Sequence, residues 1–496
     1  MSEKSKRNIL ILLNGLYPLL VIGYILLSNG KILTEFIPRW NDEVCWWQQA
    51  NAVSRYGRPL GYWGYNGGKP AVGTFAAWGP AAVLPYGLFG SIFGWNFYSY
   101  IYANIAFMSL AIFLFICLTD MDWKKLSALL AVNILQIVRN YYLSTAMAET
   151  ARYSMGILAA GMIYWLFRHE NCNKFVKYIL IPVYLLYISQ AYLCLVLCVF
   201  GYMYCILKNC SIWKRIWGGI AATALCVVFS YKSLLLLSTP YADGRTCNAV
   251  ERVFENFSGL VRLLVWTDGE SVFFRMFVWS YLVLLFVILI LLYVKRDTME
   301  TFDKTIYGAA AFILMSFLGG YIVFYNTTSW TFIRGISIGL LMATFLLCLS
   351  EIRVGVLCFI ICAVLTLPCL NEIRPVFIND RFSTEEWRED YNSLKEEFKK
   401  DIFVDSENDN PWNNTIGVIG TDQAVMDAIL ALPAGISVNV AMDGPILREP
   451  AYMLIRKKPD ADYYFMCQEY YSAGYRNIFE NDDYMLMTRL YSHRQD

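Results

Sequence analysis

Histidine is nearly absent from this chain, with His169 and His493 as the two examples among 496 residues. Both lie near polar segments, where a multi-histidine zinc centre or a serine–histidine triad is hard to build. Charged residues are also scarce, at 16% of the chain, whereas soluble domains carry about a quarter. The formal net charge of +1 gives no support to nucleic acid as a partner. Any chemistry must therefore depend mainly on carboxylates.

What the chain has instead is apolar sequence: 57% of its residues are hydrophobic and its mean hydropathy is +0.42. These values indicate an integral membrane protein with room for a soluble domain. Most of the 14 cysteines lie in apolar runs, where they act as small hydrophobic residues. Cys45, Cys247 and Cys467 fall in segments predicted to lie outside, so one disulfide could form among them, and the pairing stays open.

The first apolar run, residues 8–28, is long enough to cross a bilayer, which takes about 20 residues of helix. Lys4, Lys6 and Arg7 precede it, and because basic flanks stay cytoplasmic, we expect a cytoplasmic N-terminus. Further runs bring the total to about eleven membrane-spanning helices. They cover 97–118, 126–143, 151–168, 177–192, 194–208, 212–235, 274–294, 305–325, 332–350 and 354–370.

Short basic connections then fall on the cytoplasmic side, as the orientation rule requires, including Lys124 with Lys125 and Lys295 with Arg296. Around Ser189 the sequence leaves three alternatives open: two short spans, one broken helix or a re-entrant hairpin. Losing one span there would move the C-terminal part to the other side of the membrane. The expected fold class is an α-helical polytopic membrane protein with a small exoplasmic α/β domain at its C-terminus.

The expected division is a transmembrane domain over residues 1–371 and an exoplasmic soluble α/β domain over residues 372–496. Two polar outer loops, 29–96 and 236–273, interrupt the first domain. The second domain is far richer in Asp, Glu and Lys, and helical and strand patterns alternate in it. Its predicted elements are a helix over 384–401, a strand over 415–420, a helix over 423–430 and a strand over 436–441.

Asp42 and Glu43 follow the first span closely, within the segment 38–47. Carboxylates beside bilayer hydrocarbon usually mark a water-filled cavity that handles ions, protons or polar substrates. A helix predicted over 44–56 offers a simpler role, since Asn41 or Asp42 could serve as its N-cap. A helix N-terminus also keeps a carboxylate ionised, which is the state that a general base needs. The two roles are compatible.

A second polar cluster is predicted at the outer end of the fourth span. Its members lie on one helix face: Glu149, Arg152, Tyr153 and Gly156. The acidic and basic residues three positions apart could also form a simple local ion pair. Arg334 opens the tenth span from the same side, and snorkelling to lipid headgroups is its alternative explanation.

Cations and aromatic rings alternate in the rest of the first outer loop. Arg55, Arg58 and Lys69 could meet a phosphate there, while the tyrosines and the tryptophan among them could stack on a sugar. An ordinary aromatic belt at the membrane interface explains the rings equally well.

The order of these motifs resembles the GT-C superfamily of membrane glycosyltransferases, and most closely its branch of protein O-mannosyltransferases and lipid A aminoarabinose transferases. The resemblance covers roughly the first 170 residues in motif order. Its motifs are an Asp-Glu pair in a long outer loop, then Trp78-Gly79-Pro80 and Leu88-Phe89-Gly90. The family often has a His-Pro-Pro-like segment in the middle position, and this chain lacks that histidine. The resemblance implies that Asp42 is the catalytic carboxylate, Glu43 its neighbour and Glu149 a second acidic position.

Such an enzyme would move a sugar from a polyprenyl-phosphate donor to an acceptor hydroxyl on the outer side of the plasma or inner membrane, with inversion. One carboxylate can activate the hydroxyl, and cations can stabilise the departing phosphate. Candidates for that contact are Arg58, Lys69, Arg152 and Arg334. Mg²⁺ or Mn²⁺ held by Asp42 and Glu149 could assist. The expected partners are a polyprenyl-phosphate-linked sugar, membrane lipid and a glycan, lipid or protein acceptor.

Two other functions stay open. In a transporter or flippase, Asp42, Glu149 and Arg152 would bind a coupling ion or polar cargo, and charges buried in mid-span would distinguish that class. In a polysaccharide polymerase or ligase, the activity would depend mainly on arginines of the outer loops, and Asp42 would be replaceable.

Overall fold

A computed structural model describes most of the chain. The described ranges are 2–58, 63–65, 79–169, 171–191, 193–237, 249–265, 271–324, 329–374, 381–404, 411–419, 423–441, 450–457 and 461–489. Cys247 and Lys69 lie outside these residues, as does Trp78 of the Trp-Gly-Pro motif.

The chain packs into two compact units, each assembled from separated stretches of sequence. The helical unit comprises Met1–Lys31, Ile101–Tyr231 and Thr246–Asp380. The α/β unit comprises Ile32–Tyr100, Lys232–Arg245 and Arg381–Asp496. This packing differs from the expected consecutive division at residue 371, because the first outer loop belongs with the C-terminal residues.

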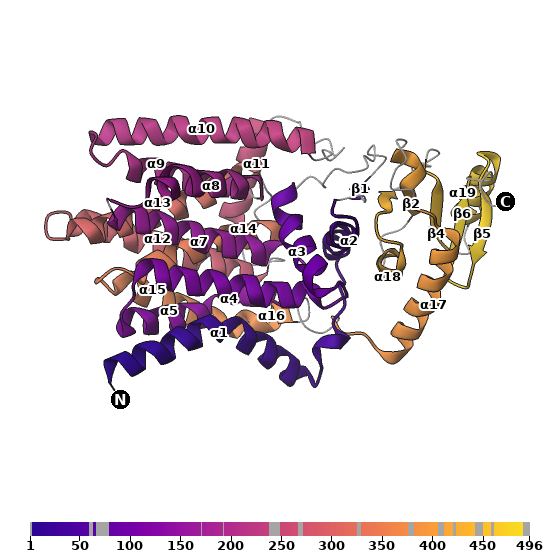
Figure 1. Cartoon of the computed structure of the whole chain (residues 1–496), viewed down its shortest axis with the longest axis horizontal. Coiled ribbons are helices and arrows are strands. Elements are labelled where there is room, and N and C mark those ends of the chain that lie inside the picture. Colours follow the sequence, from indigo (N-terminus) through magenta and orange to yellow (C-terminus); the bar gives the residue numbers. More distant parts are fainter. Residues whose placement is uncertain are drawn as a thin grey trace. The chain divides into compact units, whose positions relative to one another are not determined.

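Long apolar helices make up the helical unit (Figure 1). Their bounds are α1 Glu3–Asn29, α4 Ser99–Thr119, α5 Trp123–Leu135, α6 Ile137–Tyr142, α7 Glu149–Arg168, α8 Ile181–Ala191, α9 Leu197–Ile206, α10 Ile212–Leu237, α11 Ala249–Val265, α12 Val272–Val294, α13 Thr301–Phe324, α14 Trp330–Leu347, α15 Val354–Thr366 and α16 Leu370–Arg374.

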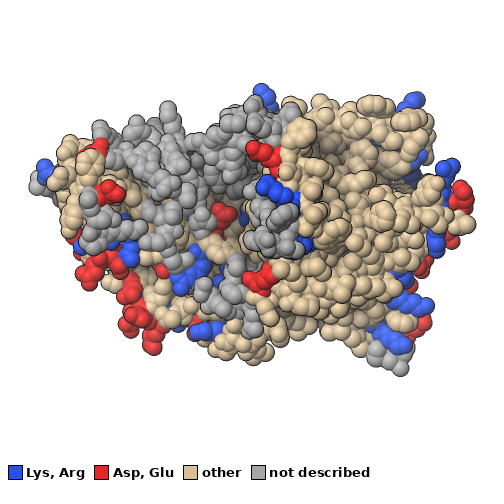
Figure 2. Space-filling model, turned by 180° about the vertical axis from the view of Figure 1, so that it is seen from behind, with Lys and Arg blue, Asp and Glu red and all other residues tan. Residues whose placement is uncertain are grey.

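Seven helices in the described part of the chain are long and apolar enough to cross a membrane. They belong to α1, α4, α10, α12, α13, α14 and the segment Val354–Glu372. Figure 2 shows a broad uncharged surface over this unit, with charged side chains gathered toward its end. Large apolar side chains are exposed there, as for Leu225 and Phe286, so this surface suits lipid. The helical unit is that of a membrane protein.

By length and composition the described residues give seven candidate spans, and the total of about eleven stays a prediction. Other predicted runs form shorter or interrupted helices, such as α5, α8 and α9. The run 126–143 breaks between α5 and α6 at Gln136, whose Nε2 donates a hydrogen bond of 2.9 Å to the Thr344 hydroxyl. The region around Ser189 forms two short helices, α8 and α9, with a 3₁₀ turn over Leu193–Val196 between them.

Helix α14 forms the buried centre of the helical unit, with 16 of its 18 residues buried. Two glycines on it face α13, and neither has room for a side chain. A Cβ added at Gly335 would lie 1.8 Å from Cζ of Tyr321, and one at Gly339 would lie 2.7 Å from Cβ of Phe317. Small residues four apart let two membrane helices approach closely.

The α/β unit contains a six-stranded sheet in the order β1-β3-β2-β4-β6-β5. Its strands are β1 Trp63–Tyr65, β2 Thr415–Ile419, β3 Ser437–Ala441, β4 Tyr452–Arg456, β5 Arg476–Glu480 and β6 Tyr484–Thr488. The first four in the sheet order run parallel, and β6 and β5 are antiparallel to their neighbours. The unexpected member is β1, which comes from the first outer loop and pairs with β3.

Helices of the α/β unit come from both ends of the chain: α2 Asn41–Tyr56, α3 Pro80–Phe93, α17 Glu385–Asp401, α18 Gln423–Ala431 and α19 Ala461–Ser472. The predicted strand–helix–strand order β2-α18-β3 is confirmed, and so is the amphipathic helix α17, which buries Tyr391, Leu394 and Phe398. Helix α2 is fixed on two sides. Gly87 of α3 packs on Val53, and the Gln48 side chain donates a hydrogen bond of 2.8 Å to the Ile429 carbonyl of α18.

Candidate active site

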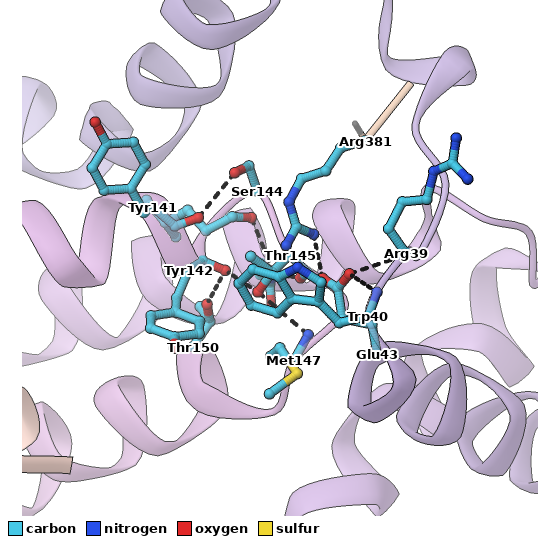
Figure 3. A network of polar contacts seen from close by, with 12 residues as sticks. Arg39, Trp40, Glu43, Tyr141, Tyr142, Ser144, Thr145, Met147, Thr150 and Arg381 are labelled. Atoms are coloured by element: carbon cyan, nitrogen blue, oxygen red, sulfur yellow. Dashed lines mark hydrogen bonds and ion pairs between the residues drawn. The ribbon is translucent and has the colours of Figure 1, made fainter. Parts of the chain in front are cut away.

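Glu43 lies in the first turn of α2 and is completely buried. Its Oε2 accepts hydrogen bonds from the backbone N–H groups of Arg39, at 2.9 Å, and Trp40, at 3.1 Å. Its Oε1 accepts from Nη1 of Arg381, as Figure 3 shows. The Arg381 guanidinium also lies over the Trp40 ring, 4.3 Å from its centroid. Glu43 therefore closes the turn that begins α2.

These contacts give Glu43 a structural role at the start of α2, and the catalytic role that the sequence suggested stays a prediction. A carboxylate with both oxygens engaged and no exposure is poorly placed to take a proton from a substrate. Sequence reasoning missed its partner Arg381, which lies 338 positions away. Backbone pairing brings them together, since the Ile37 N–H donates to the Arg381 carbonyl and the Ser383 N–H to the Glu35 carbonyl.

Asp42 differs from its neighbour because its side chain is half-buried rather than enclosed. It lies in the first turn of α2, where the backbone N–H groups favour the ionised carboxylate. Burial, and in second place the negative charge of Asp42, raises the pKa of the Cys45 thiol well above its ordinary value. Cys45 and Cys467 both carry unbridged thiols. Of the pair that follows the first span, Asp42 is thus the more exposed residue, and its catalytic role stays a prediction.

Glu149 is the centre of a second cluster, inside the helical unit. Its Oε1 accepts a hydrogen bond of 2.7 Å from Arg152 Nη1 and lies 3.6 Å from Arg334 Nη1. Its Oε2 is buried and has no hydrogen-bond partner in the described part of the chain. The Glu149 and Arg152 side chains are 2% and 3% exposed, and Arg334 is 11% exposed. Two guanidinium groups therefore share one carboxylate oxygen in a nearly dry environment.

Helices α7 and α14 run parallel, which explains how this cluster forms. The Tyr153 hydroxyl lies 2.6 Å from the Ser337 hydroxyl, one turn beyond the Glu149–Arg334 contact. Gly156 follows, where an added Cβ would lie 3.0 Å from the Met342 sulfur. The helix face predicted on the fourth span is therefore the face that packs against the tenth, and the two helix N-termini lie at the same end of the unit.

The turn before α7 is held by its own hydrogen bonds (Figure 3). The Tyr142 carbonyl accepts from the hydroxyls of Thr145, at 2.8 Å, and Thr150, at 3.1 Å. From α4, the Asn104 side chain donates to the carbonyls of Leu143 and Thr145. Glu149 thus enters the first turn of α7 at a fixed point, where the helix N-terminus stabilises its charge.

The remaining predicted site residues are distributed as follows. Arg58 is exposed just beyond α2, and Lys69 is outside the described residues. Within the described ranges, no three His, Cys, Asp or Glu side chains gather in a way that could hold a metal ion. Asp42 and Glu149 belong to different units, so the metal ion expected between them stays a prediction.

Arg139, in the short helix α6, is a buried charge that the sequence analysis did not single out. It is 1% exposed, and Nη1 and Nη2 donate to the side-chain and backbone oxygens of Asn133, each at 2.6 Å. Nε and Nη2 also donate to the Asn140 amide oxygen, and the guanidinium lies 5.4 Å from the Tyr17 ring centroid. Because neutral groups engage every guanidinium nitrogen, this cation ties α1, α5 and α6 together and gives a transporter no specific support.

Comparison with known proteins gives structural similarity alone. No family model and no curated protein matches the chain. The chain is similar to ArnT from Cupriavidus metallidurans bound to undecaprenyl phosphate, at 8% identity and a TM-score of 0.41 over 95% of this chain and 97% of that one. It is similar to the oligosaccharyltransferase AglB from Archaeoglobus fulgidus, solved with an inhibitory peptide and a dolichol-phosphate, at 11% identity and a TM-score of 0.49.

The AglB match covers 92% of this chain and 71% of that one. Both neighbours are GT-C glycosyltransferases, the superfamily that the N-terminal motifs resemble. A likeness at these scores assigns no residue role and no substrate to this protein.

Proposed function

We propose that this protein is a membrane glycosyltransferase that moves a sugar from a polyprenyl-phosphate donor to an acceptor hydroxyl, with inversion. The observation that carries the proposal is the difference in burial between Glu43 and Asp42 at the start of α2. Glu43 is held by Arg381 and two backbone N–H groups, whereas Asp42 beside it is half-buried. The buried Glu43 holds the helix N-terminus in place, and the more exposed carboxylate of Asp42 is the candidate general base.

In this proposal Asp42 accepts the proton of the acceptor hydroxyl as its oxygen attacks the anomeric carbon of the donor sugar. The new glycosidic bond forms while the bond from that carbon to the phosphate oxygen breaks. The phosphate departs with the electron pair, and a single displacement inverts the anomeric centre. The donor phosphate would be bound by Arg152 and Arg334, whose guanidinium groups Glu149 orients.

A divalent cation and the membrane orientation complete the proposal. Carboxylate oxygens are ligands that Mg²⁺ and Mn²⁺ accept, and Asp42 and Glu149 are the candidate ligands that the sequence offers. The basic N-terminus and basic connections support a cytoplasmic N-terminus in the cell membrane, with the α/β unit outside. This orientation can be tested by placing a single cysteine beside Asp42 and treating intact cells with an impermeant thiol reagent. Labelling of that cysteine would place Asp42 on the outer side.

The decisive experiment is turnover of Asp42→Asn with several prenyl-phosphate sugars, the product being identified by mass. We expect a loss of about 10²- to 10⁴-fold, the range for removing a general base. The matched control is Asp427→Asn, which changes a half-buried carboxylate of the same unit that pairs with Arg39 at 3.3 Å. Full turnover by a folded Asp42→Asn protein would reject the proposed base.

A further inference from the structure

A cleft inside the α/β unit lies apart from the residues assigned to the reaction. It runs between the C-terminal half of α2, residues 95–97, α17 and the segment after α18, and its cavity volume is about 550 Å³. Cavities of this size hold small organic ligands. None of the residues lining it is acidic, although three are cationic: Arg55, Lys395 and Lys399.

Aromatic rings form the floor of this cleft and are held rigidly. The Trp47 ring lies 5.3 Å from Phe97, and Phe97 lies 4.9 Å from Tyr391. The Trp47 indole N–H donates a hydrogen bond of 3.0 Å to the Asn96 carbonyl. Rings fixed in this way offer flat apolar surface at little entropic cost, and their faces attract weakly positive C–H groups such as those of a pyranose.

The rim of the cleft adds an exposed ring and several polar groups. Phe403 is 72% exposed, and its backbone N–H donates to the Tyr452 hydroxyl at 3.0 Å, which fixes where the ring is presented. The amides of Asn51 and Asn392 also line the cleft and can bond to hydroxyl groups. An exposed phenylalanine on a fixed backbone, beside two amides, suits a sugar ring better than a purely apolar ligand.

The charged side chains of the cleft indicate the charge of its ligand. Lys399 lies 3.9 Å from Glu396, a loose and exposed pair. Lys395 is 5.5 Å from the Tyr391 ring centroid, and Arg55 is 5.5 Å from that of Tyr56. Within the described part of the chain, neither Lys395 nor Arg55 has an acidic partner at ion-pair distance. Three cations without an acidic lining residue favour an anionic ligand.

We infer that this cleft binds an acidic oligosaccharide, with sugar rings on Phe403 and the aromatic floor and with carboxylate or phosphate groups on Lys395, Lys399 and Arg55. The inference deepens the proposed function, since it names an acidic glycan as the acceptor class. The structure assigns this site to the α/β unit alone, so binding can be measured without any donor.

The test uses the full chain in lipid nanodiscs, with trigalacturonate as the probe and neutral galactotriose as its matched comparison. We expect trigalacturonate to bind more tightly than galactotriose, and Phe403→Ala to weaken it by about tenfold. Lys395→Ala with Lys399→Ala should weaken it by about tenfold at low salt and by less as salt screens the charges. The matched controls are Phe465→Ala, which changes an exposed ring outside the cleft, and Lys400→Ala, which changes a lysine of α17 outside it.

Equal binding of the two trisaccharides, or equal losses in the cleft and control variants, would overturn the inference. So would an oligonucleotide of equal charge that binds as tightly and ignores Phe403→Ala, because the cleft would then be a general anion surface. A polyprenyl-diphosphate-linked form of trigalacturonate distinguishes a free from a lipid-borne glycan. Cleft variants that weaken both forms equally support recognition of the saccharide, and variants that spare the lipid-linked form count against it.

Asp42→Asn separates this inference from the proposed function. If the proposed function and the glycan-binding site are both correct, this variant binds trigalacturonate normally and transfers no sugar. If the variant transfers sugar at full rate while the cleft still binds the probe, the proposed base fails and the binding site stands.

Discussion

Glu43 and Glu149 are both buried carboxylates paired with arginine, yet their surroundings differ. Glu43 has both oxygens engaged, by one arginine and two backbone N–H groups. Glu149 carries two arginines on one oxygen, and its second oxygen has no hydrogen-bond partner among the described residues. Nε and Nη2 of Arg381 are buried without hydrogen-bond partners among the described residues, so the two sites differ in their carboxylates. A buried carboxylate with both oxygens bonded specifies structure, whereas one with an unbonded oxygen is costly unless a function requires it. The first pair therefore builds the fold, and the second is the better candidate for binding a donor phosphate.

The largest expected effect tests the structural half of this comparison. Glu43→Ala leaves the buried Arg381 charge without its carboxylate, which should cost about 3–5 kcal/mol of the free energy of unfolding. Hydrogen exchange of peptides from α2 and residues 381–404 measures this loss. The double variant Glu43→Leu with Arg381→Leu should recover much of the stability, and unchanged exchange in Glu43→Ala would show that this pair does not hold the fold.

The next effect tests the functional half. Arg152→Ala should lower kcat/KM for the donor by about 10²- to 10³-fold, the range for removing one group that stabilises developing charge. Arg152→Lys should restore part of the activity, because it returns the charge without the planar fork. Arg7→Ala is the control, since Arg7 forms an exposed pair with Asp120 in the same unit. A variant that unfolds more easily but keeps its donor kinetics would make the Glu149 cluster structural as well.

A smaller effect asks whether packing positions the second cluster. Gly335→Ala places a methyl group against Tyr321, which should cost about 1–3 kcal/mol of unfolding free energy and displace Arg334 beside it. Donor KM should rise by less than in Arg152→Ala. Gly319→Ala on α13 is the matched control, because an added Cβ there meets nothing within 4 Å. Equal stability and equal donor KM in the two glycine variants would show that this helix contact does not position Arg334.

The smallest expected effect on stability comes from an exposed ion pair, which serves as a comparison for the buried pairs. The Lys457 ammonium lies 2.8 Å from Glu480 Oε1, and its hydrogen bond lowers the pKa of that carboxyl. Because the folded pKa is below the unfolded value of about 4.3, the pair stabilises the fold above that pH and loses its contribution as pH falls through the folded pKa. Lys457→Gln should slightly speed exchange in β5 and β6 at pH 7 and match the original protein once the pH has fallen below the folded pKa of Glu480. A difference that persists in acid would contradict this assignment.

Local patterns were enough to predict some elements of the structure and not others. The buried face of α17 and the order β2-α18-β3 follow from periodicity over a few residues, which the chain displays clearly. The break at Gln136 depends on a Thr344 hydroxyl 208 positions away, and the lock on Glu43 depends on Arg381. No window of sequence contains both partners of such contacts. The same reasoning explains why Arg139, held by amides from two helices, was overlooked.

The pairing of β1 with β3 has a consequence for biosynthesis. Tyr65 leaves the ribosome 372 residues before Ser437 begins the strand that β1 joins (437 − 65 = 372). At about 5–20 residues per second, this edge of the sheet waits roughly 20 to 70 seconds for its neighbour. A chain interrupted before that point contains β1 without the strand that pairs with it.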